Sequence, residues 1–482
     1  MVTRNAMSFR VRSRSQPSVK PSTRGSVCIS NRTRGSFARP SSRRVREATL
    51  NAIPPSTMPG IIVTRLQTQS AIAPRELDRR RLASRRERHL GRTVPNDYYC
   101  CTCKLLKSQG CLVNASASGL ERAVRRLGQR LFRRLYPRRR SAPSDLGSID
   151  RILLVRTDKI GDAIVSTPVI QALREHFPKA RIDILLGSRS KAAGPLLPYI
   201  DSVFVAGRGV RERLMLLHRL RKSHYDVVIN LVFADSITAA VFTAGSGARM
   251  KIGFENSASA FLDFIVARPT LPMPFVPKLL LLIAPLGITV NPAEARPSIT
   301  LLPAAIDAAR HEIGRFSSDR TLLMINISGS SPRKFWGVER YAALARQLRF
   351  DGFDVVVLSA PADEQSLREI VDRSGAFMIA PRPDLMEFAA ILSFADLVVS
   401  PDTSIVHIAA ALGKPVVALV DAPVTAIEWA PWAVPNRVVG CSTGIPDILD
   451  KDVLSAVRDL AAEVAPPASS ESAASRRLNS PV

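Results

Sequence analysis

Between residues 150 and 464, short apolar runs alternate with segments in which apolar and polar residues recur at helical spacing, such as 339–348 and 405–412. Strands that alternate with helices are typical of parallel sheets covered on both faces. The pattern therefore predicts an α/β fold. The runs predicted to be strands are 152–155, 182–186, 203–206 and 227–232, followed by 322–327, 355–358, 397–399 and 416–420.

Prolines are dense between residues 269 and 303, where the first series of elements ends and the second begins. We expect two doubly wound domains of similar size that face each other, at 149–300 and 301–464. Ligands of such sheets bind outside the carboxyl ends of the strands, so the site is expected in the cleft between the domains. The tail at 465–482 is rich in Ser, Ala and Pro and is expected to be disordered.

The formal net charge of +27 is concentrated at one end of the chain. Residues 1–150 contain 32 Lys and Arg against 8 Asp and Glu, whereas the remainder contains 36 against 33. The charge therefore describes an appendage, and no specific nucleic-acid partner is predicted. We expect residues 1–118 to be a disordered Arg/Ser-rich arm. An organellar presequence and a start assigned too far upstream are the alternatives.

The segment 119–148 differs from the arm. Its leucines and Val124 recur at helical spacing, arginines occupy the positions between them, and Pro137 ends the pattern. A basic amphipathic helix at 119–136, followed by arginines up to residue 140, fits an anionic membrane surface. The alternative, which a single short helix favours, is that its apolar stripe packs on the next domain. No run of 18 apolar residues occurs, so no transmembrane helix is expected.

The first chemical motif is Arg156-Thr157-Asp158-Lys159-Ile160-Gly161-Asp162, directly after a predicted strand. Gly161 permits a tight turn, and Asp162 then stands at the start of a helix near the carboxyl edge of the sheet. A carboxylate there can accept a proton from a hydroxyl group. The alternative is a structural Asp at a helix N-terminus, which spacing alone favours.

The second motif runs from Asn326 to Trp336 and contains Ser330, Ser331 and Lys334. It lies between a strand and a helix, where small hydroxyl residues and backbone N–H groups suit a phosphate. Lys334 adds a point charge for a diphosphate. The spacing is not that of a Walker loop, and a polar loop with a surface lysine is the alternative.

The third motif opens a helix after the strand 397–399. Asp402 is expected to be the N-cap, which leaves the N–H groups of Thr403 and Ser404 directed into the cleft. His407 lies one turn inside this helix and is either a satisfied structural histidine or a functional one. Gly413 and Pro415 end the helix.

Together these motifs resemble the heptosyltransferases of glycosyltransferase family 9 over roughly residues 150–462. Gly161, Asp162, Ile164, Thr167 and Pro168 match a G-D-x-I-x-x-T-P pattern. The segment 248–254 resembles a basic turn that ends in Ile-Gly. Lys334-Phe335-Trp336 resembles a K-x-W phosphate loop, and residues 402–415 resemble D-T-G-x-x-H-x-A-A-A-L-G-x-P, with Ser404 in place of its glycine.

The resemblance implies a GT-B fold, with two Rossmann-like domains, and inverting glycosyl transfer. It implies ADP-heptose as donor and a Kdo or heptose hydroxyl on lipid A as acceptor, hence a cytoplasmic enzyme that is peripheral on the inner membrane. The role of general base falls to Asp162 and the diphosphate contact to Lys334. Donor-binding positions are Asp402, Thr403, Ser404 and His407, and Asp363 or Glu364 would contact the ribose.

Two features qualify the match. The loop Val420-Asp421-Ala422-Pro423 replaces the family's Phe/Tyr-Gly-Pro-Thr, in a loop expected to face the donor. No Asp-x-Asp motif lies near the phosphate loops, so transfer is expected to need neither metal nor cofactor, with a lysine and helix N-termini offsetting the leaving charge. The alternatives are a nucleotide-sugar-binding or isomerising relative without transfer, and a tethering protein that acts through its basic arm.

Overall fold

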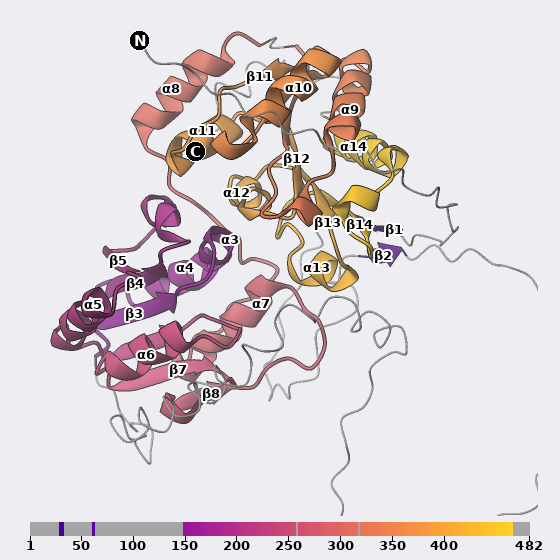
Figure 1. Cartoon of the computed structure of the whole chain (residues 1–482). Coiled ribbons are helices and arrows are strands. Elements are labelled where there is room, and N and C mark those ends of the chain that lie inside the picture. The colour runs from indigo at the N-terminus through magenta and orange to yellow at the C-terminus, as the bar shows by residue number, and fades with distance from the viewer. Residues whose placement is uncertain (1–27, 33–59, 63–147, 257–258, 317–318, 466–482) are drawn as a thin grey trace, which may run out of the picture.

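The computed structural model describes residues 28–32, 60–62, 148–256, 259–316 and 319–465. The predicted helix at 119–136, most of the basic arm and the tail from 466 lie outside the described residues. Within the described part of the chain, no helix is long and apolar enough to cross a membrane. The described residues form two α/β lobes (Figure 1).

The N-terminal lobe is built on a six-stranded parallel sheet in the order β5-β4-β3-β6-β7-β8. The central strands β3 and β4 are buried runs of Ile, Leu and Val, because helices cover both faces of a parallel sheet. The elements are β3 (Arg151–Arg156), α3 (Ile160–Ile164), α4 (Thr167–His176), β4 (Arg181–Gly187), β5 (Ser202–Ala206), α5 (Val210–Lys222), β6 (Val227–Asn230), α6 (Ile237–Gly245), β7 (Met250–Phe254), β8 (Phe264–Val266) and α7 (Phe275–Leu280).

The C-terminal lobe repeats this plan with the parallel order β11-β10-β9-β12-β13-β14. Its elements are α8 (Pro303–Ile313), β9 (Leu322–Asn326), α9 (Val338–Phe350), β10 (Asp354–Leu358), α10 (Glu364–Ser374), β11 (Phe377–Met378), α11 (Leu385–Leu392), β12 (Leu397–Pro401), α12 (Ser404–Ala411), β13 (Val416–Val420), α13 (Pro423–Glu428), β14 (Asn436–Cys441) and α14 (Asp450–Val464).

Two short strands from the basic arm extend this second sheet. Strand β1 (Cys28–Arg32) pairs antiparallel with β14, and β2 (Gly60–Ile62) pairs antiparallel with β1. These eight residues are ordered strands within a segment expected to be disordered. The extent of disorder in the rest of 1–118 stays a prediction.

The lobes touch along one side of the cleft. Helix α3 of the first lobe packs on α12 of the second, and one hydrophobic cluster runs from β3 into β9. Nearby, Phe275 stacks on Trp429 with ring centroids 4.0 Å apart, and Lys278 pairs with Glu428. Trp432 donates to the carbonyl of Ala295 at 2.8 Å. The two lobes are therefore held in contact by both apolar and polar groups.

The α/β class and the arrangement of two lobes are confirmed, but several elements depart from the sequence pattern. The segment 248–254, expected to be a turn, contains strand β7, and β8 and β14 were not predicted. The apolar run 279–286 is divided between two elements: α7 ends at Leu280 and a 3₁₀ segment follows. Pro285 lies in that segment, where the missing N–H and the fixed φ disfavour a continued α-helix.

Candidate functional site

A cavity of about 750 Å³ lies between the lobes at the carboxyl ends of both sheets. Its first wall is formed by the loops after β3 and β4, and its second by the loops after β9, β12 and β13. Parallel strands present all their carboxyl ends at one edge, so motifs far apart in sequence meet there. The predicted residues that line the cavity are Asp162, Ser330, Lys334, Asp402, Thr403, Ser404 and His407.

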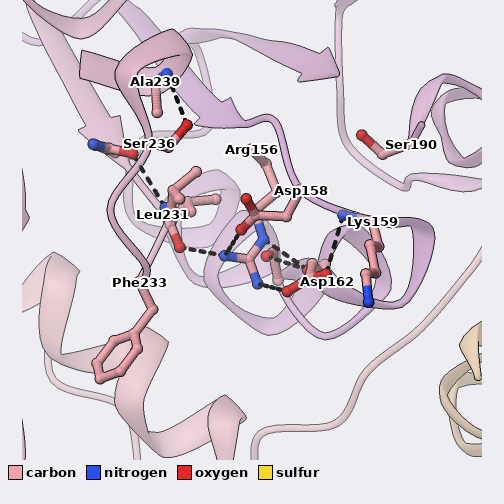
Figure 2. A network of polar contacts seen from close by, with 12 residues as sticks. Arg156, Asp158, Lys159, Asp162, Ser190, Leu231, Phe233, Ser236 and Ala239 are labelled. Atoms are coloured by element: carbon pink, nitrogen blue, oxygen red, sulfur yellow. Dashed lines mark hydrogen bonds and ion pairs between the residues drawn. The ribbon is translucent and has the colours of Figure 1, made fainter. Parts of the chain in front are cut away.

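Asp162 lies in the first turn of α3 and is 13 % exposed. Its Oδ1 accepts from Arg156 Nη2 at 3.3 Å, and its Oδ2 accepts from the Lys159 backbone N–H at 3.1 Å (Figure 2). A carboxylate has about four lone-pair sites, so these two bonds leave each oxygen able to accept once more. Asp162 therefore supports the helix start and faces the cleft at the same time, and the two interpretations of this residue are compatible.

The side chain of Arg156 is fully buried beneath this carboxylate. Its Nε donates to the Asp162 carbonyl at 2.9 Å, and its Nη1 donates to the Leu231 carbonyl and lies 3.5 Å from Asp158 Oδ2 (Figure 2). A buried charge is tolerated only when it is paired and hydrogen-bonded. The guanidinium thus fixes the loop after β3, and with it the direction of the Asp162 side chain.

Asp158 is a second carboxylate in the cavity wall, and sequence reasoning gave it no role. Burial raises the pKa of Asp158, while the nearby Arg156 guanidinium acts in the opposite direction. Desolvation disfavours the charged form of a carboxyl group. Asp158 and Asp162 therefore both pair with Arg156 at the carboxyl end of β3, although their surroundings differ.

Gly161 serves a different purpose from the one expected. It lies within α3 and is not among the glycines with positive φ. A Cβ at this position would lie 2.7 Å from Cδ2 of His407, a distance that real side chains avoid. The expected tight turn is therefore wrong, and the glycine instead permits the close approach of α3 to α12.

His407 is 5 % exposed, between Gly161 and the indole of Trp429, with ring centroids 5.6 Å apart. Burial lowers the pKa of His407, opposed by the charges of Asp402 and Asp162. A buried imidazole favours its neutral form. His407 is therefore both a packing residue between the lobes and a neutral polar group at the cavity wall.

Lys334 and Asp402 are paired with each other in the second wall. Lys334 Nζ donates to the Asp402 carbonyl at 3.0 Å and pairs with Asp402 Oδ2. The expectation that Asp402 caps α12 is wrong: Thr403 is the N-cap, and its hydroxyl accepts from the Ile405 N–H at 3.3 Å. Asp402 stands one residue outside the helix, where its carboxylate pairs with the lysine, and the Thr403 hydroxyl makes the cap.

The Lys334 loop is anchored at both ends. Trp336 is buried, and its indole N–H donates to the Ile448 carbonyl at 3.0 Å. At the other end, Asn326 donates to Ser400 Oγ at 3.0 Å, which ties β9 to the neighbouring β12. The loop between them, including Ser330, is consequently held against the start of α12.

Three predicted positions do not line the cavity. Ser331 is exposed and begins the short 3₁₀ turn before Phe335. Asp363 and Glu364 start α10, where Glu364 pairs with Arg368 at 2.6 Å. The cavity instead reaches Ala360 at this point, because the 3₁₀ turn Pro361–Asp363 carries the acidic side chains past its edge.

Several lining residues were missed by sequence reasoning. Arg189 follows β4 at the cavity edge, and its place after a strand could have indicated it. Others come from segments without a recognisable motif, and only the packing of the lobes brings them to the cavity. The missed residues include Asp158, Arg189, Phe233, Phe275, Arg382, Leu385, Phe388, Thr425 and Trp429.

Comparison with known proteins identifies the family. The family model described as glycosyltransferase family 9 (heptosyltransferase) matches residues 213–452. The fold, the two-lobed site and this match define a glycosyltransferase. The chain belongs to glycosyltransferase family 9.

Among curated proteins, the chain is similar to lipopolysaccharide core heptosyltransferase OpsX of Haemophilus influenzae, with 26% identity over 277 residues that cover 56% of this chain and 78% of the relative. It is also 26% identical to lipopolysaccharide heptosyltransferase 3 of Escherichia coli over 289 residues, 57% of this chain and 84% of the relative.

Solved structures support the fold. A glycosyl transferase family 9 protein from Veillonella parvula superposes with a TM-score of 0.58 at 19% identity, covering 66% of this chain and 99% of the relative. The E. coli ADP-heptose lps heptosyltransferase II gives a TM-score of 0.54 at 20% identity, covering 65% and 99%. The prediction of a GT-B architecture is confirmed.

Proposed function

We propose that this chain transfers a heptose from ADP-heptose to a Kdo or heptose hydroxyl of the lipopolysaccharide inner core, with inversion at the anomeric carbon. One observation carries the proposal: a carboxylate from one lobe and a lysine–helix pair from the other line a single cavity. The names of the relatives, which act in lipopolysaccharide core assembly, supply the donor and acceptor classes.

Asp162 is the proposed general base. The acceptor oxygen attacks the anomeric carbon, its proton passes to the carboxylate, and the bond from that carbon to the diphosphate oxygen breaks with its electron pair. Arg156 and the Lys159 N–H hold one lone pair of each carboxylate oxygen and leave others for the substrate. Arg156 is then a positioning residue, because it contacts Asp162 and not the reacting atoms.

The departing diphosphate needs positive charge on the opposite wall. Lys334 has three N–H donors, and two of them are directed to Asp402. The third, the backbone at the start of α12 and the Ser330 loop support binding of the diphosphate. Asp402 keeps the ammonium group in place but offsets its charge, so the helix N-terminus is expected to share the leaving charge with Lys334.

The nucleotide has a different proposed contact from the one expected. Pro383, Leu385 and Phe388 line the cavity beside Arg382, and an apolar surface next to a guanidinium suits a nucleobase with its phosphates. Asp421 and Thr425 also line the cavity, so the loop that departs from the family pattern is well placed to select the sugar.

The remaining partner assignments are also proposals. A saccharide acceptor on lipid A would bring the enzyme to the inner face of the inner membrane, as a cytoplasmic, peripheral protein. The basic segment 119–140, which contains the helix expected at 119–136, would contribute to that attachment. Neither the membrane surface nor the location is needed for the chemistry of the cleft.

The test is a transfer assay with purified full-length protein, ADP-heptose and Kdo-lipid A, read by product mass and by ADP release. We expect product with ADP-heptose, none with UDP- or GDP-sugars, and unchanged rates in EDTA. ADP-heptose should also raise the melting temperature by mass action. Binding of ADP-heptose without product on either a Kdo or a heptose acceptor would contradict the proposal and favour a nucleotide-sugar-binding relative.

A further inference from the structure

Helix α5 exposes three large apolar side chains within its first two turns. Val210, Leu214 and Met215 are 74 %, 61 % and 60 % exposed. Residues four apart in a helix share one side, so Val210 and Leu214 are neighbours, and Met215 lies on the adjoining exposed side of the helix. Single exposed apolar residues are common on protein surfaces, but neighbouring ones on one helix form a patch that marks an interaction site.

The packing of α5 does not require this patch. Leu216 and Leu220 are the buried residues of the helix, and they join the cluster beneath β3 and β4. The helix therefore has two apolar sides, one against the sheet and one directed outward. Figure 1 shows α5 on the side of its lobe away from the C-terminal lobe, and its main packing partners among the described elements are α6 and β5.

The charged residues around the patch are mostly positive. The thirteen residues of α5 include Arg211, Arg213, Arg219, Arg221 and Lys222 but a single acidic residue, Glu212. The Glu212 side chain folds back over Gly207 and Gly209, against the loop before the helix. Arg211, Arg219 and Lys222 are exposed on the helix. The outward side therefore combines large apolar groups with cationic ones.

We propose that the outer side of α5 is a docking surface for an anionic lipid bilayer. Apolar side chains on a basic helix insert at the level of the lipid headgroups, while the surrounding arginines and lysine bind lipid phosphates. A protein partner with the same complementarity would need an acidic, apolar groove. The bilayer offers both properties over the whole length of the helix, and it is therefore the occupant assigned here.

Helix α5 begins at the same edge of the sheet as the cleft. Strand β5 ends at Ala206, so the first turns of α5 lie at the carboxyl edge of the sheet, the edge that carries Asp162. Two strand spacings, about 10 Å, separate β5 from β3. Docking through Val210, Leu214 and Met215 would hold the open edge of the cleft beside the membrane. The proposal extends the proposed function but is tested without any transfer reaction.

The first experiment measures co-sedimentation of the full-length protein with phosphatidylglycerol–phosphatidylcholine vesicles. The double variant Leu214→Gln/Met215→Gln should bind at least roughly tenfold more weakly, and Arg211→Gln and Lys222→Gln about fivefold more weakly each. Phe350→Gln, at an 87 % exposed position on the other lobe, is the matched control and should bind as the parent does. Equal binding of the Leu214/Met215 double variant and the control would overturn the proposal.

A local probe separates α5 from the basic arm, which has its own affinity for anionic lipid. Tryptophan emission of Leu214→Trp, relative to the parent, should shift to the blue on anionic vesicles, and that of Phe350→Trp should not. An unshifted Leu214→Trp emission on protein that co-sediments would overturn the proposal. Blue-shifted Leu214→Trp emission in the absence of vesicles would also overturn the proposal, because it would mean that another part of the chain covers this side of α5. Self-association of the protein that the Leu214→Gln/Met215→Gln variant abolishes would overturn it as well, in favour of a second copy of the chain.

Discussion

Two short helices, α3 and α12, begin at the cleft. Each has an acidic residue near its N-terminus, but the position and the partner of that residue differ between them. In α3 the carboxylate of Asp162 lies inside the helix and is held by the fully buried Arg156. Before α12 the carboxylate of Asp402 lies outside the cap and is paired with the partly exposed Lys334.

The difference concerns which partner remains accessible to a substrate. Arg156 is out of reach beneath the loop, so in α3 it is the anion that faces the cavity. Lys334 and Asp402 both line the cavity, so the second wall presents an ion pair that includes an accessible ammonium group. The first wall therefore offers a carboxylate and the second an ammonium group, which the proposed inverting transfer would use as proton acceptor and charge acceptor.

The largest expected effect comes from removing the anion. Asp162→Asn should lower kcat by about 10²–10⁴-fold, because general base catalysis is lost, while ADP-heptose still raises the melting temperature. Asp158→Asn, in the same cavity and beside the same arginine, is the matched control and should lose far less. A retained rate in Asp162→Asn would remove the proposed base.

Removing the buried partner should act on the fold as well as on the rate. Arg156→Met removes the guanidinium that pairs with Asp158 and Asp162 and donates to the Leu231 carbonyl, and we expect a loss of about 3 kcal/mol in the free energy of unfolding. Denaturant titration measures it. If stability were unchanged and only KM rose, Arg156 would be a substrate contact and not a positioning residue.

Lys334→Ala should lower kcat/KM by about 10²–10³-fold through weaker stabilisation of the leaving diphosphate, and Lys334→Arg should recover part of it. Lys159→Ala, an exposed lysine on the opposite wall, serves as the control. Equal losses from the two alanine variants would mean that general positive charge, and not the Lys334–Asp402 arrangement, binds the donor.

Gly161→Ala tests the contact between the lobes. The added methyl group would meet His407 at 2.7 Å, so α3 and α12 must move apart, at a cost of about 1–3 kcal/mol and a smaller loss of rate than Asp162→Asn. The double variant Gly161→Ala/His407→Ala removes the clash and should regain stability. No recovery would point to the backbone of α3 as the cause.

The smallest expected effect is a dependence of stability on pH. Burial lowers the pKa of His407 below its ordinary 6.5 in the folded state, so the unfolded chain binds the proton more readily. The free energy of unfolding should fall as the pH drops below about 6.5, and His407→Gln should flatten that slope. An unchanged slope, measured by thermal unfolding across pH 5–8, would assign it to other groups.

Much of the fold could be predicted because the strands are buried on both faces and therefore appear as apolar runs. The runs 152–155, 355–358 and 416–420 agree with β3, β10 and β13 almost residue for residue. Strand β7 could not be recognised, since Lys251 and Gly253 interrupt its pattern. Strand β14 begins with two polar residues: Asn436 donates to the nearby Val434 carbonyl, and Arg437 is buried by its pairing with Glu463 of α14.

The order of apolar runs, the carboxylate after β3 and the polar loops after β9 and β12 are local properties, and the sequence alone determined them. Tertiary structure decided which atoms meet: Arg156 beneath Asp162, Lys334 on Asp402, and Gly161 against His407. The local sequence pattern predicts which segments are buried and where helices end, because both properties depend on residues that are neighbours in the chain. Pairing of charges and close approach of helices depend on how two sheets 170 residues apart (Ile152 to Leu322) are set against each other.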